Sequence, residues 1–261
     1  MRAAAERAAR TSYGRLIALL AAPTRNIALA EDALADAFEQ ALRTWPQAGV
    51  PDNPDAWLLT VARNRQRDVW KSAAVRTTVQ AYTEPHSGAG GTPAPYLDPA
   101  PDQIPDKRLE LLFVCAHPAI DPAVRTPLML QTVLGFEASQ IGAAFAMPGA
   151  AMAQRLVRAK RRIRDAGIPF AVPTRDEMPA RLGAVLEAIY GAYAIDWQGV
   201  SGETVRESLS GEALYLAVTL AALLEGSGDE AEALGLASLI SHSIARAAAR
   251  APGGSFVALD E

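Results

Sequence analysis

Residues 144–167, AFAMPGAAMAQRLVRAKRRIRDAG, contain the pattern of a helix-turn-helix. Pro148 stands where a second helix would begin, which is the helical position that tolerates proline best. After it, apolar residues recur at every third or fourth position, and this spacing predicts a helix with one buried face. The predicted stripe consists of Met152, Leu156, Ala159 and Ile163.

The first helix of this motif is expected over residues 137–145, with Ile141 and Phe145 facing inward. The small Gly142 would let the two helices approach closely, and residues 146–147 would form the tight turn between them. On the second helix, polar side chains occupy the face opposite the apolar stripe: Gln154, Arg155, Arg158, Arg161 and Arg162. Such a face suits a DNA major groove. A merely solvated basic helix is the alternative, but the proline, the small residues and the stripe agree in register.

Composition limits the classes of protein to consider. The chain has 261 residues, 50% of them hydrophobic, which is enough for two or three small domains. Its formal net charge is −4, yet residues 1–79 carry +3 and residues 170–261 carry −8, so the acidic C-terminal third conceals locally basic segments. We expect neither a membrane span nor a signal peptide. The single cysteine, Cys115, excludes an intrachain disulfide framework and fits a reducing cytoplasm.

Helical patterns run through the whole chain and no strand pattern is found, so the sequence predicts an all-α fold. Asn26 is a candidate N-cap for a helix that would bury one apolar face. That face would comprise Ala30, Leu34, Phe38, Leu42 and Trp45. Prolines and a glycine over residues 46–54 would then break the chain, and a new helix would start near Asp55.

These breaks predict four parts. A helical domain over residues 1–78 is followed by a linker over residues 79–106, which is rich in Pro, Gly and Ala and is expected to be flexible. Residues 107–169 would form the helix-turn-helix domain, ended by a glycine cap and a proline. Residues 170–261 would form a C-terminal helical domain.

Several segments together resemble the sigma-70 family, in particular its extracytoplasmic-function (group four) sigma factors. IGAAFAMPGAAMAQRLVRAKRRIR, residues 141–164, resembles region four. PQAGVPDNPDAWLLTVARNRQR, residues 46–67, resembles region two, and LAEDALADAF, residues 29–38, resembles the acidic helix that grips the polymerase clamp. The part after residue 167 resembles a subgroup with a C-terminal tetratricopeptide-like extension, although no clean ~34-residue repeat is seen. That subgroup continues a little further than this chain.

The resemblance implies that the chain recruits core RNA polymerase to promoter DNA. In region two it assigns polymerase binding to a carboxylate row: Glu31, Asp32 and Asp36. The family usually has Gln-Glu where this chain has Ala35-Asp36, so the grip on the polymerase would differ. A helix side would contact the minus-ten element through Arg63, Asn64, Arg67 and Lys71. The loop with Asp52 and Asn53 would capture a base flipped from the duplex.

In region four we expect Gln154 and Arg158 to contact base edges. Ala150 and Val157 would make apolar contacts. The phosphate contacts would come from Arg155, Arg161 and Arg162. Many relatives carry a long polar residue at the position of Ala153, so one direct contact to DNA is expected to be absent.

The C-terminal part is the least informative. Its negative charge argues against DNA contact, and it would either fold back on the basic surfaces or hold the protein competent, with a regulatory protein as a further possible partner. The histidines lack zinc-ligand spacing, Cys115 lies in an apolar run, and we expect no enzyme activity, cofactor or metal.

The alternative function is a one-component helix-turn-helix regulator whose C-terminal domain binds a ligand or dimerises. Such a regulator has no need of the region-two surfaces.

Overall fold

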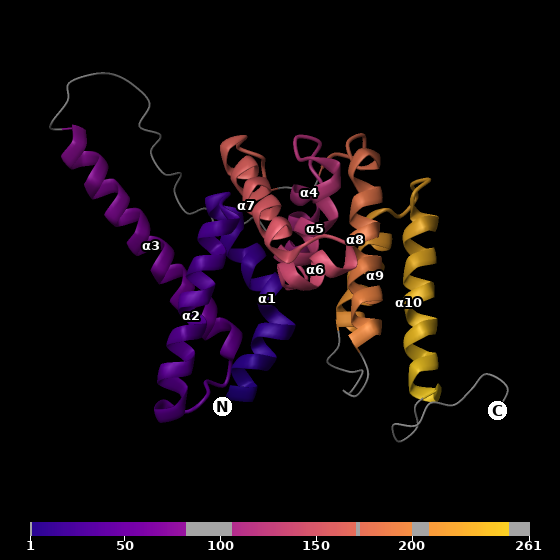
Figure 1. Cartoon of the computed structure of the whole chain (residues 1–261), viewed down its shortest axis with the longest axis horizontal. Coiled ribbons are helices and arrows are strands. Elements are labelled where there is room, and N and C mark those ends of the chain that lie inside the picture. The colour runs from indigo at the N-terminus through magenta and orange to yellow at the C-terminus, as the bar shows by residue number, and fades with distance from the viewer. Residues whose placement is uncertain (1, 82–105, 171–172, 200–208, 251–261) are drawn as a thin grey trace. The chain divides into compact units, whose positions relative to one another are not determined.

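The computed structural model describes residues 2–81, 106–170, 173–199 and 209–250. Every regular element in these ranges is a helix, so the all-α prediction is confirmed (Figure 1). The predicted linker lies almost wholly outside the described residues. The helices are α1 (Arg2–Thr24), α2 (Ile27–Ala48), α3 (Pro54–Ala81), α4 (Lys107–Cys115), α5 (Pro122–Thr132), α6 (Ala138–Ala144), α7 (Gly149–Asp165), α8 (Pro179–Gly199), α9 (Leu209–Leu223) and α10 (Glu230–Arg250). None of these described helices is long and apolar enough to cross a membrane.

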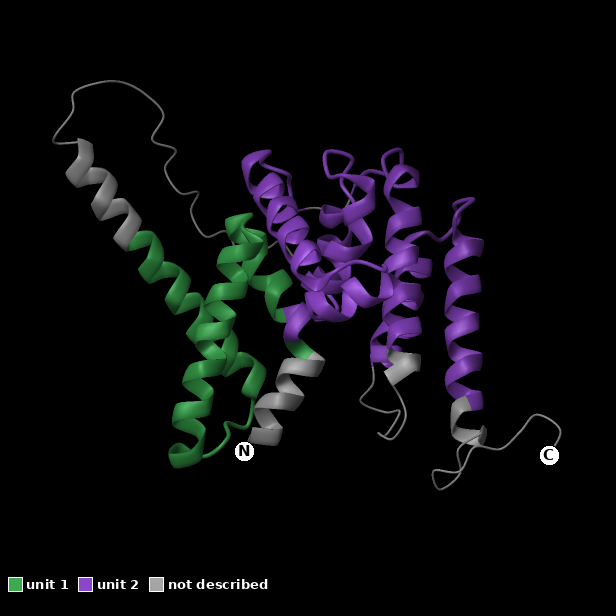
Figure 2. Cartoon of the chain, in the orientation of Figure 1, with its two compact units in different colours: residues 1–12, 16–103 green, residues 13–15, 104–261 purple. Residues whose placement is uncertain are grey.

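The chain divides into two compact units, coloured separately in Figure 2. The first unit holds residues 1–12 and 16–103, and therefore α2, α3 and most of α1. The second holds residues 13–15 and 104–261, with α4 to α10. The boundary expected at residues 169–170 falls inside the second unit, where α8 packs on α5 and α4.

Helix α2 begins at a side-chain cap and buries one face against α3. Oδ1 of Asn26 accepts a hydrogen bond from the N–H of Leu29 at 3.1 Å, so the predicted cap is confirmed. The buried face comprises Ile27, Ala30, Ala33, Leu34, Ala37, Ala41 and Trp45. The prediction was wrong for Leu42, which is 53% exposed, and Phe38 is only half-buried. Alanines replace them because their small side chains let α3 pack closely.

The break expected over residues 46–54 is shorter than predicted. Helix α2 continues through Pro46 to Ala48, and Gly49, with a φ of +86°, ends it by donating its N–H to the carbonyl of Trp45 at 3.0 Å. Pro46 lies in the last turn, where it removes one hydrogen bond to the carbonyl four residues earlier without ending the helix at that residue. Only residues 49–53 then connect α2 to α3, whose start at Pro54 agrees with the prediction.

Side-chain caps also define the helices of the second unit. Asp106 caps α4, and Asp121 caps α5 by accepting from the N–H of Ala123 at 3.0 Å. At the end of α7 the predicted glycine cap is confirmed: Gly167 has a φ of +61°, and the N–H of Ile168 reaches back to the carbonyl of Ile163 at 3.2 Å. This pairing satisfies carbonyls that the helix end would otherwise leave open.

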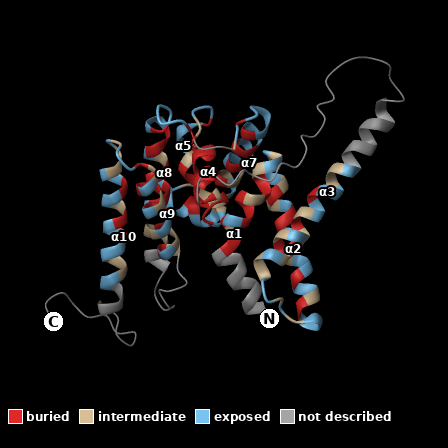
Figure 3. Cartoon of the chain, turned by 180° about the vertical axis from the view of Figure 1, so that it is seen from behind, coloured by how far each residue is buried: buried red, intermediate tan, exposed pale blue. Residues whose placement is uncertain are grey.

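The second unit is centred on α4, which is the most completely buried helix in Figure 3. Each residue from 109 to 116 is buried, including the expected structural Cys115. Helix α5 packs against α4, α7 and α8, and α9 packs against both α8 and α10 (Figure 1). The predicted region-four helices and the C-terminal helices thus share one core.

Candidate nucleic-acid interface

The turn between α6 and α7 depends on small residues. The N–H of Met147 donates to the carbonyl of Gly142 at 2.8 Å, and Ala146 adopts a left-handed φ of +50°. A Cβ on Gly142 would lie 2.6 Å from the carbonyl oxygen of Met147, which is closer than real Cβ atoms come. Gly142 is therefore required for the predicted close approach. Phe145, expected to face inward, is instead 37% exposed because the chain leaves α6 at this residue.

Helix α7 has the predicted two-sided character. All four residues of its apolar stripe are buried: Met152, Leu156, Ala159 and Ile163. Lys160 is also buried, at 8% exposure, and was not predicted. Helical spacing could have predicted this burial, because Lys160 follows the buried Leu156 by four residues and therefore lies on the same face. The basic run between residues 155 and 164 thus contributes one lysine to the interior and its arginines to the surface.

The residues predicted to contact DNA in region four lie together on the exposed side of α7. The exposed set is Ala150, Gln154, Arg155, Val157, Arg158, Arg161 and Arg162. Among the described residues, Arg155, Arg158 and Arg161 form no ion pair, while Nε of Arg162 donates to the carbonyl of Ala119 at 3.4 Å. Several exposed arginines on one helix face create the positive potential that a phosphate backbone requires.

The predicted carboxylate row on α2 is less uniform than expected. Asp32 is exposed, whereas Glu31 and Asp36 are half-buried. Nε of Arg65 donates to Oδ2 of Asp36 at 2.5 Å, so Asp36 already joins α2 to α3. Sequence reasoning missed this pair because the residues are 29 positions apart. Asp32 is therefore the most accessible carboxylate of the three for a basic partner.

Three of the four residues predicted along one side of α3 are exposed. These are Asn64, Arg67 and Lys71, with Nη2 of Arg67 donating to Oδ1 of Asn64. Arg63 is half-buried and has partners of its own, so it does not share their exposure. On the inner side, Nε2 of the buried Gln66 donates to the carbonyl of Leu20 at 3.2 Å and thereby attaches α3 to α1.

The short loop before α3 uses one of its two predicted base-contacting residues for structure. Oδ1 of Asn53 accepts from the N–H of Ala56 at 3.0 Å and caps α3, while Asp52 is exposed. Trp57, in the first turn of α3, packs edge-on against the buried Trp45 with ring centroids 5.5 Å apart. This contact favours a packing role for the tryptophan over insertion between bases.

Among the described residues, the remaining ionisable groups do not cluster into a metal-binding group. In the described part of the chain no three His, Cys, Asp or Glu side chains are grouped as for a metal ion. His117 accepts through Nδ1 from the N–H of Ala119 at 3.1 Å. Partial burial, together with the charges of Arg181 and Arg125, lowers its pKa against the opposing charge of Glu177. A histidine that accepts a hydrogen bond at Nδ1 carries no proton on that nitrogen, so its ring is neutral. The hydrogen bond therefore agrees with the lowered pKa.

Comparisons with known proteins associate the two ends of the chain with different families. Residues 9–76 match the model of Sigma-70 region 2, and residues 181–261 match a Family of unknown function (DUF6596). An uncharacterized protein of Rhizobium meliloti (strain 1021) is 36% identical over 228 residues, covering 85% of this chain and 53% of the relative. The chain thus spans about half of that relative's length. No solved structure matches. The region-two match supports membership of the sigma-70 family.

Proposed function

We propose that this chain is an alternative sigma factor of the extracytoplasmic-function (group four) type. The observation that carries the proposal is the presence, in one chain, of a Sigma-70 region 2 match and of α7, whose exposed Arg155, Arg158 and Arg161 form no ion pair among the described residues. A transcription initiation factor needs both a polymerase-binding domain and a second DNA contact. A one-component repressor needs only the second.

The proposed roles follow the exposure of each surface. Residues 1–78 recruit core RNA polymerase, with Asp32 as the leading carboxylate, and Asn64, Arg67 and Lys71 of α3 contact the minus-ten element. Residues 107–169 hold the minus-thirty-five element, where Gln154 and Arg158 contact base edges and the other exposed arginines hold phosphates. The protein acts in the cytoplasm, where polymerase and promoter meet, and residues 170–261 modulate its activity.

The test is run-off transcription with core polymerase, the full chain and two single variants. Arg158→Ala should lose promoter-specific transcript while still co-eluting with core enzyme, because its side chain would contact only DNA. Asp32→Asn should weaken co-elution and leave binding to an isolated minus-thirty-five duplex intact. Arg164→Ala is the matched control on α7, since that exposed arginine pairs with its neighbour Asp165 at 2.7 Å.

Two results would overturn the proposal. The first is wild-type protein that does not co-elute with core enzyme at low salt. The second is wild-type protein that binds a palindromic duplex unaided, as a one-component regulator does.

A further inference from the structure

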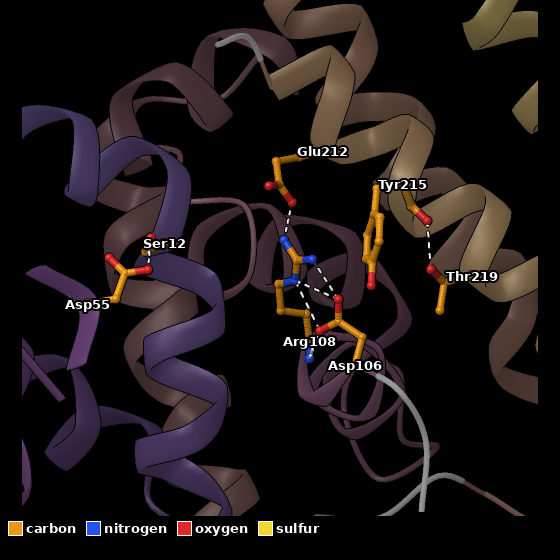
Figure 4. Close-up of polar contacts among 7 residues, drawn as sticks. All are labelled: Ser12, Asp55, Asp106, Arg108, Glu212, Tyr215 and Thr219. Atoms are coloured by element: carbon orange, nitrogen blue, oxygen red, sulfur yellow. Dashed lines mark hydrogen bonds and ion pairs between the residues drawn. The ribbon is translucent and has the colours of Figure 1, made fainter. Parts of the chain in front are cut away.

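The N-terminus of α4 is held by a cluster of side chains from two distant parts of the second unit (Figure 4). Asp106 caps α4 by accepting from the N–H of Arg108 at 2.9 Å, and the same carboxylate accepts from Nη2 of Arg108 at 2.5 Å. Nη1 of Arg108 donates to Glu212 on α9, 104 positions further along the chain. One arginine therefore joins the cap of α4 to α9.

The arginine is held on several sides. Its side chain is only 12% exposed and that of Asp106 only 6%, while Glu212 is 31% exposed. The face of the guanidinium lies 5.0 Å from the ring centre of Tyr215, which follows Glu212 by less than one helical turn. Burial works to lower the pKa of Arg108, but its hydrogen bond to Asp106 and the charge of Glu212 outweigh it and raise that pKa. The arginine is therefore charged whenever the protein is folded.

We propose that Arg108 is a clamp through which α9 fixes the point where residues 79–106 join the second unit. Asp106 is the last residue of that segment and directly precedes α4, so its position sets where the chain enters the helix. If Glu212 withdraws, Arg108 loses its only contact to α9 among the hydrogen bonds and ion pairs of the described residues. The stacking of Arg108 on Tyr215 is then the remaining link from α9 to the cap of α4.

The clamp acts at a different place from the DNA face. The base- and phosphate-contacting residues of α7 are exposed although α8, α9 and α10 are present in the same unit. The described C-terminal helices therefore do not regulate by covering α7. They control how α4 is attached to the segment before it. This control is relevant to transcription only if the proposed function holds.

The experiment is hydrogen exchange of the full chain, followed by mass spectrometry on the peptide that covers the first turn of α4. Glu212→Gln keeps the shape of the side chain and removes its charge. Arg108→Lys keeps the charge and removes the forked geometry. Both should speed exchange in that turn about tenfold, the effect of losing one charge-assisted hydrogen bond. The control is Glu225→Gln, an exposed carboxylate just after α9, which should change nothing. Exchange in α5 corrects for any general loss of stability.

The clamp is refuted if Glu212→Gln speeds exchange in α9 alone, or if Arg108→Lys exchanges like the wild type. A second arm measures run-off transcript from Glu212→Gln. A lower yield with unchanged binding to an isolated duplex supports control at the entry point, and an unchanged yield with faster exchange refutes that control. If the wild type gives no transcript, the proposed function fails, while the exchange result still decides whether the clamp exists.

Discussion

Helices α4 and α7 have opposite relations to their surroundings within the same unit. On α7, buried and exposed residues alternate with helical spacing, so one side enters the core and the other meets solvent. On α4, every residue from 109 to 115 is buried, whatever side of the helix it occupies. Glu110 in this stretch pairs with Lys107 at 2.6 Å, and the other residues are apolar on all sides of the helix, as is typical of a helix inside a structure rather than on its surface.

The difference shows which helices complete the core. Helix α8 packs on α4 and α5, and Oγ1 of Thr126 on α5 donates to Glu187 on α8 at 2.9 Å. Without α8, both α4 and α5 would lose part of their cover. The C-terminal helices are therefore part of the structural support of α4, whereas the exposed face of α7 is free to bind another molecule.

The largest effect should come from removing that cover. A chain ending at Phe170 lacks α8 to α10, and we expect its second unit to lose cooperative unfolding because the exposed surfaces of α4 and α5 cannot be buried elsewhere. Residues 1–81, which carry their own core in the first unit, should keep a cooperative transition when produced alone. Thermal melts followed by near- and far-ultraviolet circular dichroism distinguish the two. A sharp transition in the chain ending at Phe170, in addition to the one that residues 1–81 show alone, would show that α4 does not need α8.

Shortening single side chains to alanine should show the same difference between α4 and α7, with smaller losses of stability. Leu112 on α4 is 0% exposed and Val157 on α7 is 48% exposed. We expect Leu112→Ala to lower the free energy of unfolding by about 2–5 kcal/mol. Val157→Ala should change it by less than about 0.5 kcal/mol. Urea unfolding of both full-length variants measures the difference. Equal losses would mean that the burial of α4 contributes no more than the surface of α7.

The sequence predicted the two-sided helix well and the surrounded helix poorly. The stripe of α7, its polar face and the glycine cap after it depend on spacing within one helix, and they were predicted correctly. For α4, a continuous run of apolar residues does not indicate which side of the helix faces which neighbour. Nothing in the sequence therefore identified α8 as the helix that covers it. Long-range partners such as Arg108 and Glu212 were missed for the same reason.

Errors in the first unit also arose from packing. The spacing rule placed Leu42 on the buried face of α2, but the close approach of α3 favoured the smaller Ala41. Similarly, the sequence pattern predicts Asp36 as an exposed carboxylate on α2, although Arg65 of α3 pairs with it. Helical periodicity predicts which side of a helix is buried to within a residue, but it does not identify the neighbour.

The exposed face of α7 gives the next prediction. Arg155→Ala should leave unfolding unchanged, because that side chain has no ion pair among the described residues. If Arg155 holds a phosphate, the slope of log affinity against log salt for a promoter duplex should become shallower by about 1. Titrations at several salt concentrations measure it. An unchanged slope would exclude Arg155 from the phosphate contacts, with Arg164→Ala as the matched control.

The smallest effect concerns His117, just after the surrounded α4. Burial and the charges of Arg181 on α8 and Arg125 on α5 lower its pKa, so the folded protein favours the neutral ring that accepts from Ala119. A lowered pKa means that the stabilisation is present above about pH 6.5, the unfolded value, and is lost as the pH falls toward the folded value. His117→Asn keeps a side-chain acceptor and cannot titrate. Between pH 7.5 and 5.5 the melting temperature of the wild type should therefore fall further than that of the variant. The difference should be small because the ring is largely solvated. Parallel pH profiles for both proteins would contradict this assignment and would indicate that the arginines of α5 and α8 do not act on the ring.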